Sequence, residues 1–284
     1  MKALLICPDE RAGVAALAEI APLPNLPILG KSLVEYWLEH LATLGAREVL
    51  VLAADRPDQV RGGIGDGARW GLRVTVHPDK RERTPDEARA KHQANDRDAW
   101  LAAPNDVFLM DHLPGLPRLP LFTSYADWFA AARALMPHAL TPDRIGVREV
   151  KPGVWVGLNA RVAARAEWIA PCWIGERAWI DARAVIGPDA VLEREVFIPR
   201  GAEVSRSVIG PHTFVGRFTE IRNSIAWGNT LINWQRDSCL KVSDPFLLCS
   251  LESRRVRPAP AQARAPAPLP ALVRFREYVS QLLA

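Results

Sequence analysis

Short apolar runs alternate with a segment of helical period in the first part of the chain. Residues 3–7 and 48–54 are apolar runs of strand length, and apolar residues in 32–44 recur with the spacing of an amphipathic helix. A strand, a crossover helix and a second strand predict a βαβ unit with a parallel sheet. Further segments predict strands at 72–77 and 106–110, a short helix at 128–136, and an exposed helix or loop in the charged stretch 80–99. Residues 62–71 are glycine-rich.

A different period governs the second part of the chain. Bulky, mostly aliphatic residues recur every six positions at Val150, Val156, Val162, Trp168, Ile174, Ile180, Ile186, Leu192, Ile198 and Val204, and after one shorter step at Ile209, Val215 and Ile221. A second, mostly small series lies four residues further on, from Ala160 to Val208. Neither a helix nor a simple strand has this period, whereas a parallel β-helix does, because each six-residue unit supplies one face of a triangular coil. The pattern predicts about four coils, with the aliphatic residue inside and the small residue at the corner.

Two further features of this repeat lead to specific predictions. Glycines directly follow several aliphatic positions, as in Ile174-Gly175 and Ile209-Gly210, and we expect them to permit the turns. Trp173 and Trp179 are six residues apart, so we expect them to stack on adjacent coils. Such an aromatic stripe fills the coil, holds a sugar ring or contacts a partner subunit.

The end of the chain is rich in alanine, proline and arginine. Residues 249–270 predict an extended linker and 271–284 an amphipathic helix. Six arginines and one acidic residue lie from position 254 onward, which gives the tail a net charge of +5. Because the whole chain has a net charge of +4, the remainder has a net charge of about −1. The basicity therefore belongs to the tail, which we expect to contact a partner protein or an anionic membrane surface, or to pack on its own domain. No nucleic-acid-binding pattern accompanies it, and we expect no nucleic-acid partner.

Composition narrows the class of protein. The chain has 284 residues, of which 49% are hydrophobic and 24% charged, which is ordinary globular usage. No apolar run reaches the length of a membrane span, and the apolar start is too short for a secretory signal. The four cysteines are scattered without a C-x-x-C pair. These features predict a cytoplasmic protein without a disulfide framework.

Four stretches of the first part together resemble the sugar-phosphate nucleotidylyltransferase family. They are Lys2-Ala3-Leu4-Leu5, Leu26-Pro27-Ile28-Leu29-Gly30-Lys31-Ser32-Leu33-Val34-Glu35-Tyr36, Leu44-Gly45-Ala46-Arg47-Glu48-Val49 and Gly65-Asp66-Gly67-Ala68-Arg69-Trp70-Gly71-Leu72. The resemblance implies a Rossmann-like catalytic domain followed by a left-handed parallel β-helix. We therefore expect an α/β domain at 1–145, shortened in its sugar-binding part, a left-handed β-helix at 146–248, and the linker and helix of the tail.

The family joins a sugar 1-phosphate to a nucleoside triphosphate, and the resemblance implies where its chemistry would lie. Cys7, Asp9, Arg11 and Gly13 occupy the glycine-rich phosphate-binding turn after the first strand. The two turn glycines of the family's G-x-G-T-R pattern fall on Asp9 and Arg11, and its arginine falls on Gly13. Arg11 is the one candidate for a compensating catalytic contact, whereas Asp9 and its neighbour Glu10 would repel phosphate.

Two other family positions are altered or displaced. Leu23 stands at the position of the phosphate-binding lysine, and Asp111 is the candidate ligand for the Mg²⁺ ion that an active enzyme would need. With the turn glycines and the lysine missing, we expect weak or no transferase activity, and without that activity we expect no cofactor. Five motif positions survive, which we interpret as structural turn residues: Gly30, Lys31, Gly65, Asp66 and Gly67.

Three hypotheses for function follow. The first is a divergent sugar-phosphate nucleotidylyltransferase of polysaccharide biosynthesis, which would bind a nucleotide sugar or sugar phosphate. The second is a non-catalytic regulatory or binding subunit on the same scaffold, which forms homo- or hetero-oligomers through the β-helix. The third is a hexapeptide acyltransferase with His212 as general base, although His212 is also explained as a surface turn residue.

Overall fold

The computed structural model describes residues 1–94, 99–138 and 146–252. Residues 1–251 form one compact unit. Most of the tail, residues 253–284, lies outside the described residues, and so does the predicted C-terminal helix. Cys249 and Ser250, at the start of the expected linker, belong to the strand β23 (Leu248–Ser250).

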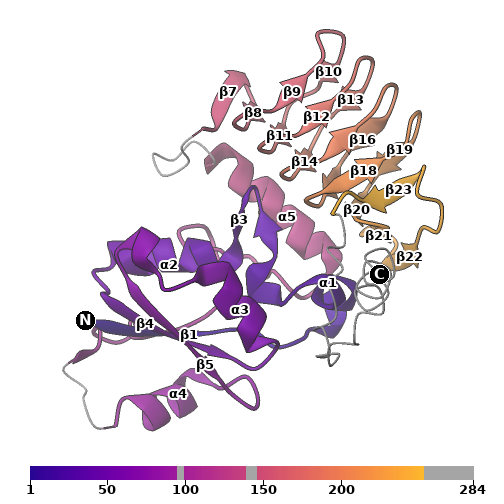
Figure 1. Cartoon of the computed structure of the whole chain (residues 1–284). Helices are drawn as coiled ribbons and strands as arrows, with labels where there is room; N and C mark the ends of the chain where they lie inside the picture. Colours follow the sequence, from indigo (N-terminus) through magenta and orange to yellow (C-terminus); the bar gives the residue numbers. More distant parts are fainter. Residues whose placement is uncertain (95–98, 139–145, 253–284) are drawn as a thin grey trace, which may run out of the picture. The chain divides into compact units, whose positions relative to one another are not determined.

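The first part of the chain folds around a parallel sheet with the strand order β5-β4-β1-β6 (Figure 1). The strands are β1 (Lys2–Ile6), β4 (Glu48–Ala53), β5 (Arg73–Pro78) and β6 (Val107–Leu109). Leu5 pairs with Val51 on one side and with Phe108 on the other. Leu4 and Leu5 are both fully buried, as expected for a parallel strand covered on both faces. The predicted parallel α/β sheet is confirmed.

Helices connect these strands at places that the apolar pattern predicts only in part. The α-helices are α1 (Ala15–Ile20), α2 (Leu33–Thr43), α3 (Pro57–Ile64), α4 (Pro85–His92) and α5 (Tyr125–Leu135), and 3₁₀ turns occur at Ala12–Val14, Leu23–Asn25, Ala68–Trp70 and Met136–His138. Helix α2 begins after Ser32, whose N–H donates to Glu35 Oε2 at 2.6 Å. Helix α3 extends into the glycine-rich segment at 62–71, because Pro57 starts it and Val60 and Ile64 are buried.

The second part of the chain consists of three sheets of short strands. The β10 sheet contains β10 (Glu167–Trp168), β13 (Val185–Ile186), β16 (Glu203–Ser205) and β19 (Glu220–Arg222). The β9 sheet contains β9 (Arg161–Val162), β12 (Trp179–Ile180), β15 (Phe197–Ile198), β18 (Thr213–Val215) and β23. The β8 sheet contains β7 (Arg148–Lys151), β8 (Val154–Val156), β11 (Cys172–Ile174), β14 (Ala190–Leu192), β17 (Ser207–Ile209), β20 (Ser224–Trp227), β21 (Thr230–Asn233) and β22 (Ser238–Lys241).

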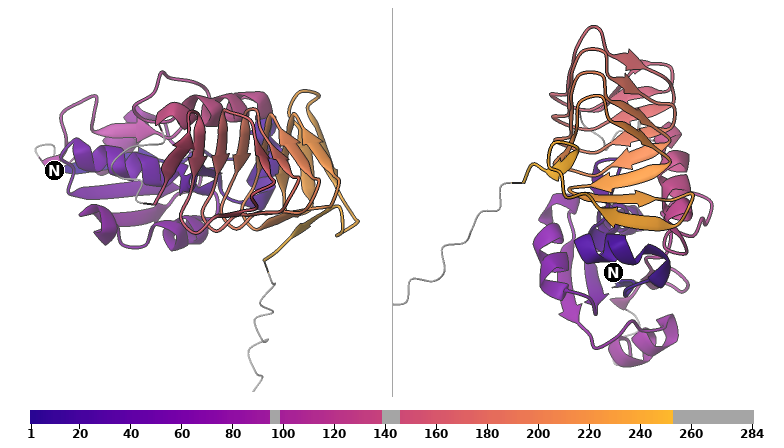
Figure 2. Two further views of the ribbon diagram at one scale, coloured as in Figure 1. Left: turned by 90° about the horizontal axis from the view of Figure 1, so that it is seen from above. Right: turned by 90° about the vertical axis from the view of Figure 1, so that its right-hand side faces the viewer.

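From β8 to β20 the chain passes through these three sheets in a fixed order, and strands of successive passages pair in parallel (Figure 2). The added strands β7, β21, β22 and β23 pair antiparallel with their neighbours. Cys172 pairs with Val154 and with Ala190, each 18 residues away. Three six-residue units therefore make one coil, and we call residues 148–250 the coil region. Ile174, Ile186 and the other ladder aliphatics between them are buried. The prediction that the six-residue positions form the coil core is confirmed for these residues.

The glycines of the repeat have a different role from the predicted one. Gly157, Gly175 and Gly210 do not have a positive φ, whereas Asn159, Arg177, Glu195 and His212 at one corner of the coils do. A Cβ atom on Gly175 would lie 2.5 Å from the backbone carbon of Glu193 on the next coil. These glycines are therefore needed for the close approach of successive coils. The residue two positions after each glycine adopts the left-handed conformation that makes the turn. Gly187, with a φ of 104°, combines both roles.

The predicted stack of Trp173 on Trp179 is wrong. Residues six positions apart lie on neighbouring faces of one coil, so Trp173 is in β11 and Trp179 in β12. Trp173 pairs with Trp155 and is 2% exposed. Trp179 instead stacks on Phe197 with ring centroids 6.0 Å apart, and Phe197 stacks on Phe214. Stacking follows the length of one coil, which is 18 residues from Trp179 to Phe197 and 17 from Phe197 to Phe214, because only that separation brings two residues to the same face.

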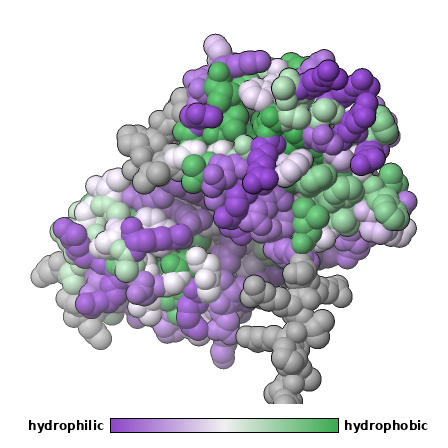
Figure 3. Space-filling model, turned by 45° about the horizontal axis from the view of Figure 1, so that its top comes forward, coloured by the Kyte–Doolittle hydropathy of each residue, from purple (hydrophilic) through white to green (hydrophobic). Residues whose placement is uncertain are grey.

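The α/β part and the coil region share one hydrophobic core. The outward side chains of the β8 sheet, among them Trp155, Trp173 and Val191, belong to the same buried cluster as Trp37 of α2 and Trp128 of α5. Phe129 of α5 stacks on Trp234, with ring centroids 4.7 Å apart. Helix α5 thus lies against the β8 sheet in Figure 1. The outward side chains of the other sheets are more exposed, and Figure 3 shows hydrophobic residues reaching the surface of the coil region among hydrophilic ones.

A buried carboxylate also joins the two parts. The hairpin of β2 (Pro27–Ile28) and β3 (Lys31–Ser32) turns at Leu29 and Gly30, which both have a positive φ. Their N–H groups donate to the two carboxylate oxygens of Glu193, at 2.8 and 2.9 Å. Glu193 is only 1% exposed. The turn therefore provides a cradle of backbone donors for a side chain of the coil region.

Candidate functional site

The carboxyl edge of the parallel sheet has a topological switch point between β1 and β6. The chain passes from β1 to β4 and β5 on one side and returns to β6 on the other side. In open α/β sheets, ligands bind at such a crevice, outside the carboxyl ends of the strands. Here the loop after β1 carries Arg11, and Asp111 follows β6. Both residues line one cavity of about 530 Å³, together with residues 118–123.

A carboxylate from another segment is bound in the loop after β1. The Asp9 N–H donates to Glu82 Oε2 at 2.8 Å. Arg11 Nη2 donates to both oxygens of Glu82, at 2.8 and 2.7 Å. Arg11 is 35% exposed and Glu82 19% exposed in their side chains. The cation that was expected to compensate for the altered turn is therefore paired with an acid of this same chain.

Gly13 has a packing role that explains why no arginine stands at its position. A Cβ atom on Gly13 would lie 2.0 Å from the backbone oxygen of Thr123. The loop after β1 thus runs directly against the segment that leads into α5. Leu23, at the position of the family's lysine, is 1% exposed and belongs to the hydrophobic core. Neither position presents a cation to the cavity.

Asp111 is held by two basic side chains. Its Oδ1 contacts His112 Nδ1 at 2.5 Å, and its Oδ2 accepts a hydrogen bond from Arg118 Nη2 at 2.9 Å. Burial, which raises the pKa of Asp111, is outweighed by these contacts with His112 and Arg118, so the pKa lies below its usual value.

The donor set around Asp111 does not fit a Mg²⁺ ion as it stands. Mg²⁺ prefers near-octahedral coordination by oxygen atoms. Both oxygens of Asp111 have partners, and in the described residues no group of three or more His, Cys, Asp and Glu side chains is arranged to hold a metal ion. Binding of Mg²⁺ by Asp111 remains a prediction, and it would require Arg118 to move away.

The other two strands of the sheet also end next to paired acids. After β4, Asp55 Oδ2 accepts from Arg56 Nη2 at 2.7 Å. After β5, Asp79 is paired with Arg83 and, at 3.3 Å, with Lys91. The hydrogen bond from Arg83 is the main reason that the pKa of Asp79 lies well below its ordinary value. Every strand end at this edge therefore has a carboxylate that an arginine neutralises.

Cys7 lies beneath this layer of charges. It is 3% exposed, and burial, followed by the nearby negative charges of Glu82 and Asp55, raises the pKa of its thiol strongly. The thiol is therefore neutral and inaccessible. Cys7 lines the base of the loop without offering a nucleophile or a phosphate ligand.

The five surviving motif positions lie away from this cavity. Gly30 makes the turn that holds Glu193, and Lys31 Nζ pairs with Glu39 at 2.8 Å. Gly65 and Gly67 have positive φ values of 69° and 83°. Asp66 Oδ1 accepts the Ala68 N–H at 3.0 Å. All of these contacts are made within turns or between elements of the chain itself.

His212 lies on the coil region, at a corner next to β18. Its Nδ1 is 2.9 Å from Glu195 Oε2, and Glu195 also pairs with Arg177 at 2.6 Å. A histidine oriented by a carboxylate has the arrangement of a general base. The cavity at the carboxyl edge does not include His212.

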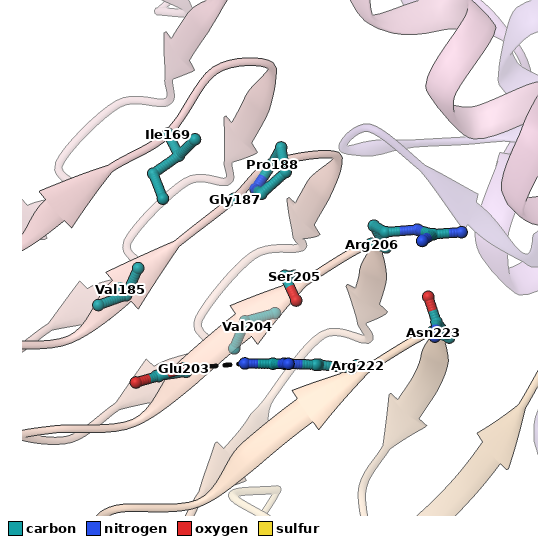
Figure 4. A pocket seen from close by; sticks show the side chains of 10 residues that line it. All are labelled: Ile169, Val185, Gly187, Pro188, Glu203, Val204, Ser205, Arg206, Arg222 and Asn223. Atoms are coloured by element: carbon teal, nitrogen blue, oxygen red, sulfur yellow. Dashed lines mark ion pairs between the residues drawn. The ribbon is translucent and has the colours of Figure 1, made fainter.

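Two further cavities have surroundings of a different kind. One, of about 420 Å³, lies on the β10 sheet between successive coils, with Val185, Val204 and Ile169 among its lining residues and an ion pair of Glu203 with Arg222 (Figure 4). The other, of about 480 Å³, lies beside α2 and is lined by Tyr36 and His40. Burial, followed by the charge of His112, lowers the pKa of His40. Neither cavity includes a residue of the loop after β1.

Glu82, Arg118 and the segment at Thr123 are parts of the site that no sequence pattern indicates. Glu82 lies in the charged stretch that predicted an exposed helix or loop, 71 residues from Arg11. A run of mixed charges does not reveal which distant side chain each member will meet. The proline- and leucine-rich segment 114–121 likewise has no period that predicts its course over the loop.

Comparison with known proteins gives a partial similarity. No known family profile matches the chain. A stretch of 78 residues is 27% identical to a glucose-1-phosphate thymidylyltransferase of Streptomyces griseus. The matched stretch covers 28% of this chain and 22% of that protein, so the chain matches less than a quarter of this relative's length. In the part of the chain that the structure describes, no helix is long and apolar enough to cross a membrane. The similarity supports a coarse relation to the nucleotidyltransferases.

Proposed function

We propose that this protein is a sugar-phosphate nucleotidylyltransferase-like protein of nucleotide-sugar metabolism whose own catalytic turnover is weak or absent. The partial similarity to a thymidylyltransferase supports the family, and the cavity at the switch point between β1 and β6 is where such a sheet binds a ligand. The observation that carries the catalytic part of the proposal is the pairing of Arg11 with Glu82.

The physical reason lies in the charge of the reaction. Transfer of a nucleotidyl group builds up negative charge on phosphate oxygens, and enzymes stabilise it with preorganised donors and cations. Loss of one such donor commonly lowers the rate about 100- to 1,000-fold. In this chain Arg11 is neutralised by Glu82 and Leu23 is buried, so two stabilising charges are lacking at the cavity.

In this proposal the coil region is a left-handed β-helix that mediates oligomers in the cytoplasm.

A non-catalytic subunit that binds a sugar nucleotide or an active paralogue is the alternative function that a structural observation supports. Trp179 is 43% exposed and forms a stack with Phe197 and Phe214 on the outer face of the β9 sheet. The rings face one another, and Arg161 lies over Trp179 at 5.4 Å, so the stack favours contact with a protein over stacking on a sugar ring.

A pyrophosphate-release assay tests the proposal. The full chain is incubated with Mg²⁺, a panel of sugar 1-phosphates and each nucleoside triphosphate, and we expect no turnover above background. Turnover that Asp111→Ala abolishes and His212→Ala leaves unchanged would refute the proposed weak catalysis. A thermal-shift screen with nucleotide sugars then tests ligand binding, and an acyl-transfer assay compared between wild type and His212→Ala tests the acyltransferase alternative.

A further inference from the structure

The two donors of the loop after β1 form an anion site that is already filled. The Asp9 N–H and the Arg11 guanidinium converge on one carboxylate, that of Glu82, with all three hydrogen-bond distances between 2.7 and 2.8 Å. A backbone N–H beside a guanidinium is the donor set that binds an oxygen of a phosphoryl group. The Glu82 carboxylate therefore occupies the position at which an external anion would accept hydrogen bonds from Asp9 and Arg11.

The segment that carries Glu82 is a short turn rather than a rigid element. It lies between β5 and α4, and it is fixed at one end by Asp79, whose N–H donates to the Ala53 oxygen at 2.9 Å. At the other end Thr84 caps α4 and accepts the Glu87 N–H. Glu82 can therefore leave its donors by rotation of its side chain, with Asp79 and Thr84 still in place.

The contact of Glu82 is accessible to solvent, so a dissolved anion can compete with it. The Arg11 side chain is 35% exposed and that of Glu82 is 19% exposed. A diphosphate carries more charge than a carboxylate and has two phosphoryl groups. Arg11 and Arg118 line the same cavity, so these groups would have one arginine each once Arg11 is released from Glu82 and Arg118 from Asp111. The acids Asp9 and Glu10 on the loop, and Asp111 in the cavity, oppose binding.

We infer that Glu82 is a built-in competitor that keeps diphosphate-containing ligands out of the loop after β1. Its carboxylate holds Arg11 and the Asp9 N–H, and a diphosphate binds only when Glu82 swings away. This inference rests on the proposed function in so far as the ligand is a nucleotide or a nucleotide sugar. The exclusion itself depends only on the contacts of Glu82.

Binding of inorganic pyrophosphate to the full chain tests the inference by isothermal titration calorimetry. Glu82→Gln and Glu82→Ala should bind it about tenfold or more tightly than wild type, a gain of about 1.4 kcal/mol. Asp86→Asn is the matched control, because it removes one negative charge at a side chain that is 95% exposed and pairs with Arg89. It should bind like wild type. The double variant Glu82→Ala/Arg11→Ala should lose the gain.

The inference is overturned if both Glu82 variants, shown by circular dichroism to be folded, bind pyrophosphate no better than Asp86→Asn. It is also overturned if the gain persists without Arg11. The proposed function fails on a different result. Clear turnover by the wild-type chain in the pyrophosphate-release assay would refute weak catalysis, whatever the Glu82 variants bind. Conversely, a gain of pyrophosphate binding in Glu82→Ala without binding of any nucleotide sugar would support the exclusion and count against the proposed ligand.

Discussion

Two carboxylates of this protein are bound by donors of a loop, namely two backbone N–H groups for Glu193 and one backbone N–H with the Arg11 guanidinium for Glu82, yet their surroundings differ. Glu193 of the coil region is 1% exposed and accepts from Leu29 and Gly30. Glu82 is 19% exposed in its side chain and accepts from Asp9 and Arg11. Removing Glu193 would leave the buried N–H of Leu29 away from water, whereas water can replace Glu82 at its donors.

Similar hydrogen bonds can therefore have different roles, depending on how deeply the carboxylate is buried. A buried charged hydrogen bond is hard to break because its partners cannot be solvated once it is gone. A partly exposed one competes with water for the same groups. We therefore assign Glu193 to the permanent architecture that joins the coil region to the α/β part, and Glu82 to a replaceable contact.

The largest effect that we expect comes from Glu193→Ala. The substitution takes away the acceptor of two backbone N–H groups, and the buried one, that of Leu29, is left unsatisfied at a cost of about 1–3 kcal/mol. A cavity also replaces the buried side chain, so the free energy of unfolding, measured by urea denaturation, should fall by about 2–5 kcal/mol. Glu176→Ala is the control, because Glu176 is 45% exposed and pairs with Arg177. Equal, small losses in both variants would break the comparison.

A smaller loss is expected for Gly13→Ala in the loop after β1. The added Cβ would lie 2.0 Å from the Thr123 oxygen, so the loop or the segment before α5 must shift. Overpacking of this kind costs about 1–3 kcal/mol. Gly62→Ala in α3, where the Cβ meets nothing within 4 Å, should instead be neutral or stabilising. An unchanged unfolding midpoint for Gly13→Ala would show that the loop itself is easily displaced.

Acid should weaken the segment that presents Glu82 through Asp79, whose side chain is 4% exposed. The hydrogen bond from Arg83 holds the folded-state pKa of Asp79 below its unfolded value, which is about 3.9. The stabilisation is therefore complete above that pH and is lost as the pH falls toward the folded-state pKa.

Denaturation curves recorded between about pH 6 and pH 3 measure this effect, since the unfolded-state pKa of an aspartate lies within that range. Asp79→Asn should be less stable than wild type near neutral pH and should lose less on acidification. Asp58→Asn, at a side chain that is 90% exposed, is the control and should follow the wild-type curve. Parallel curves for wild type and Asp79→Asn would contradict the role of Asp79.

The smallest change in stability is expected for Glu82→Gln. Glu82 and Arg11 are both partly exposed, so the variant should unfold within about 1 kcal/mol of wild type. Urea denaturation beside Glu193→Ala measures the contrast directly. A loss as large as that of Glu193→Ala would mean that Glu82 belongs to the permanent architecture, and the comparison between the two carboxylates would fail.

Local periodicity predicted the secondary structure better than it predicted the contacts of side chains. Residues such as Ile174 and Ile186 are buried where the six-residue pattern predicts, because a repeated unit meets only its own neighbours. The predicted pair Trp173 and Trp179 failed, because the pattern gives the face of each residue but stacking requires the same face on the next coil. The predicted role of Gly175 failed for a related reason, since its constraint comes from Glu193 on the adjacent coil.

The sequence predicted where the candidate site lies, but it did not predict which of the site's charged side chains pair with each other. The apolar strand 3–7 and the charged loop after it placed Asp9 and Arg11 at the carboxyl edge of the sheet, and Asp111 after a later strand lies at the same cavity. The partners of these residues, Glu82 and Arg118, come from segments without a regular pattern. Only the folded chain shows which charges neutralise each other.

A parallel α/β sheet, a coil of six-residue units and a loop with altered phosphate-binding residues all follow from the amino-acid order alone. These properties depend on the order and spacing of residues, which the chain carries before it folds. The tertiary structure decided that Glu82 fills the donors of that loop and that Glu193 fastens the hairpin at Leu29 and Gly30. Such contacts join residues far apart in the chain, and their strength depends on burial, a property that exists only once the chain has folded.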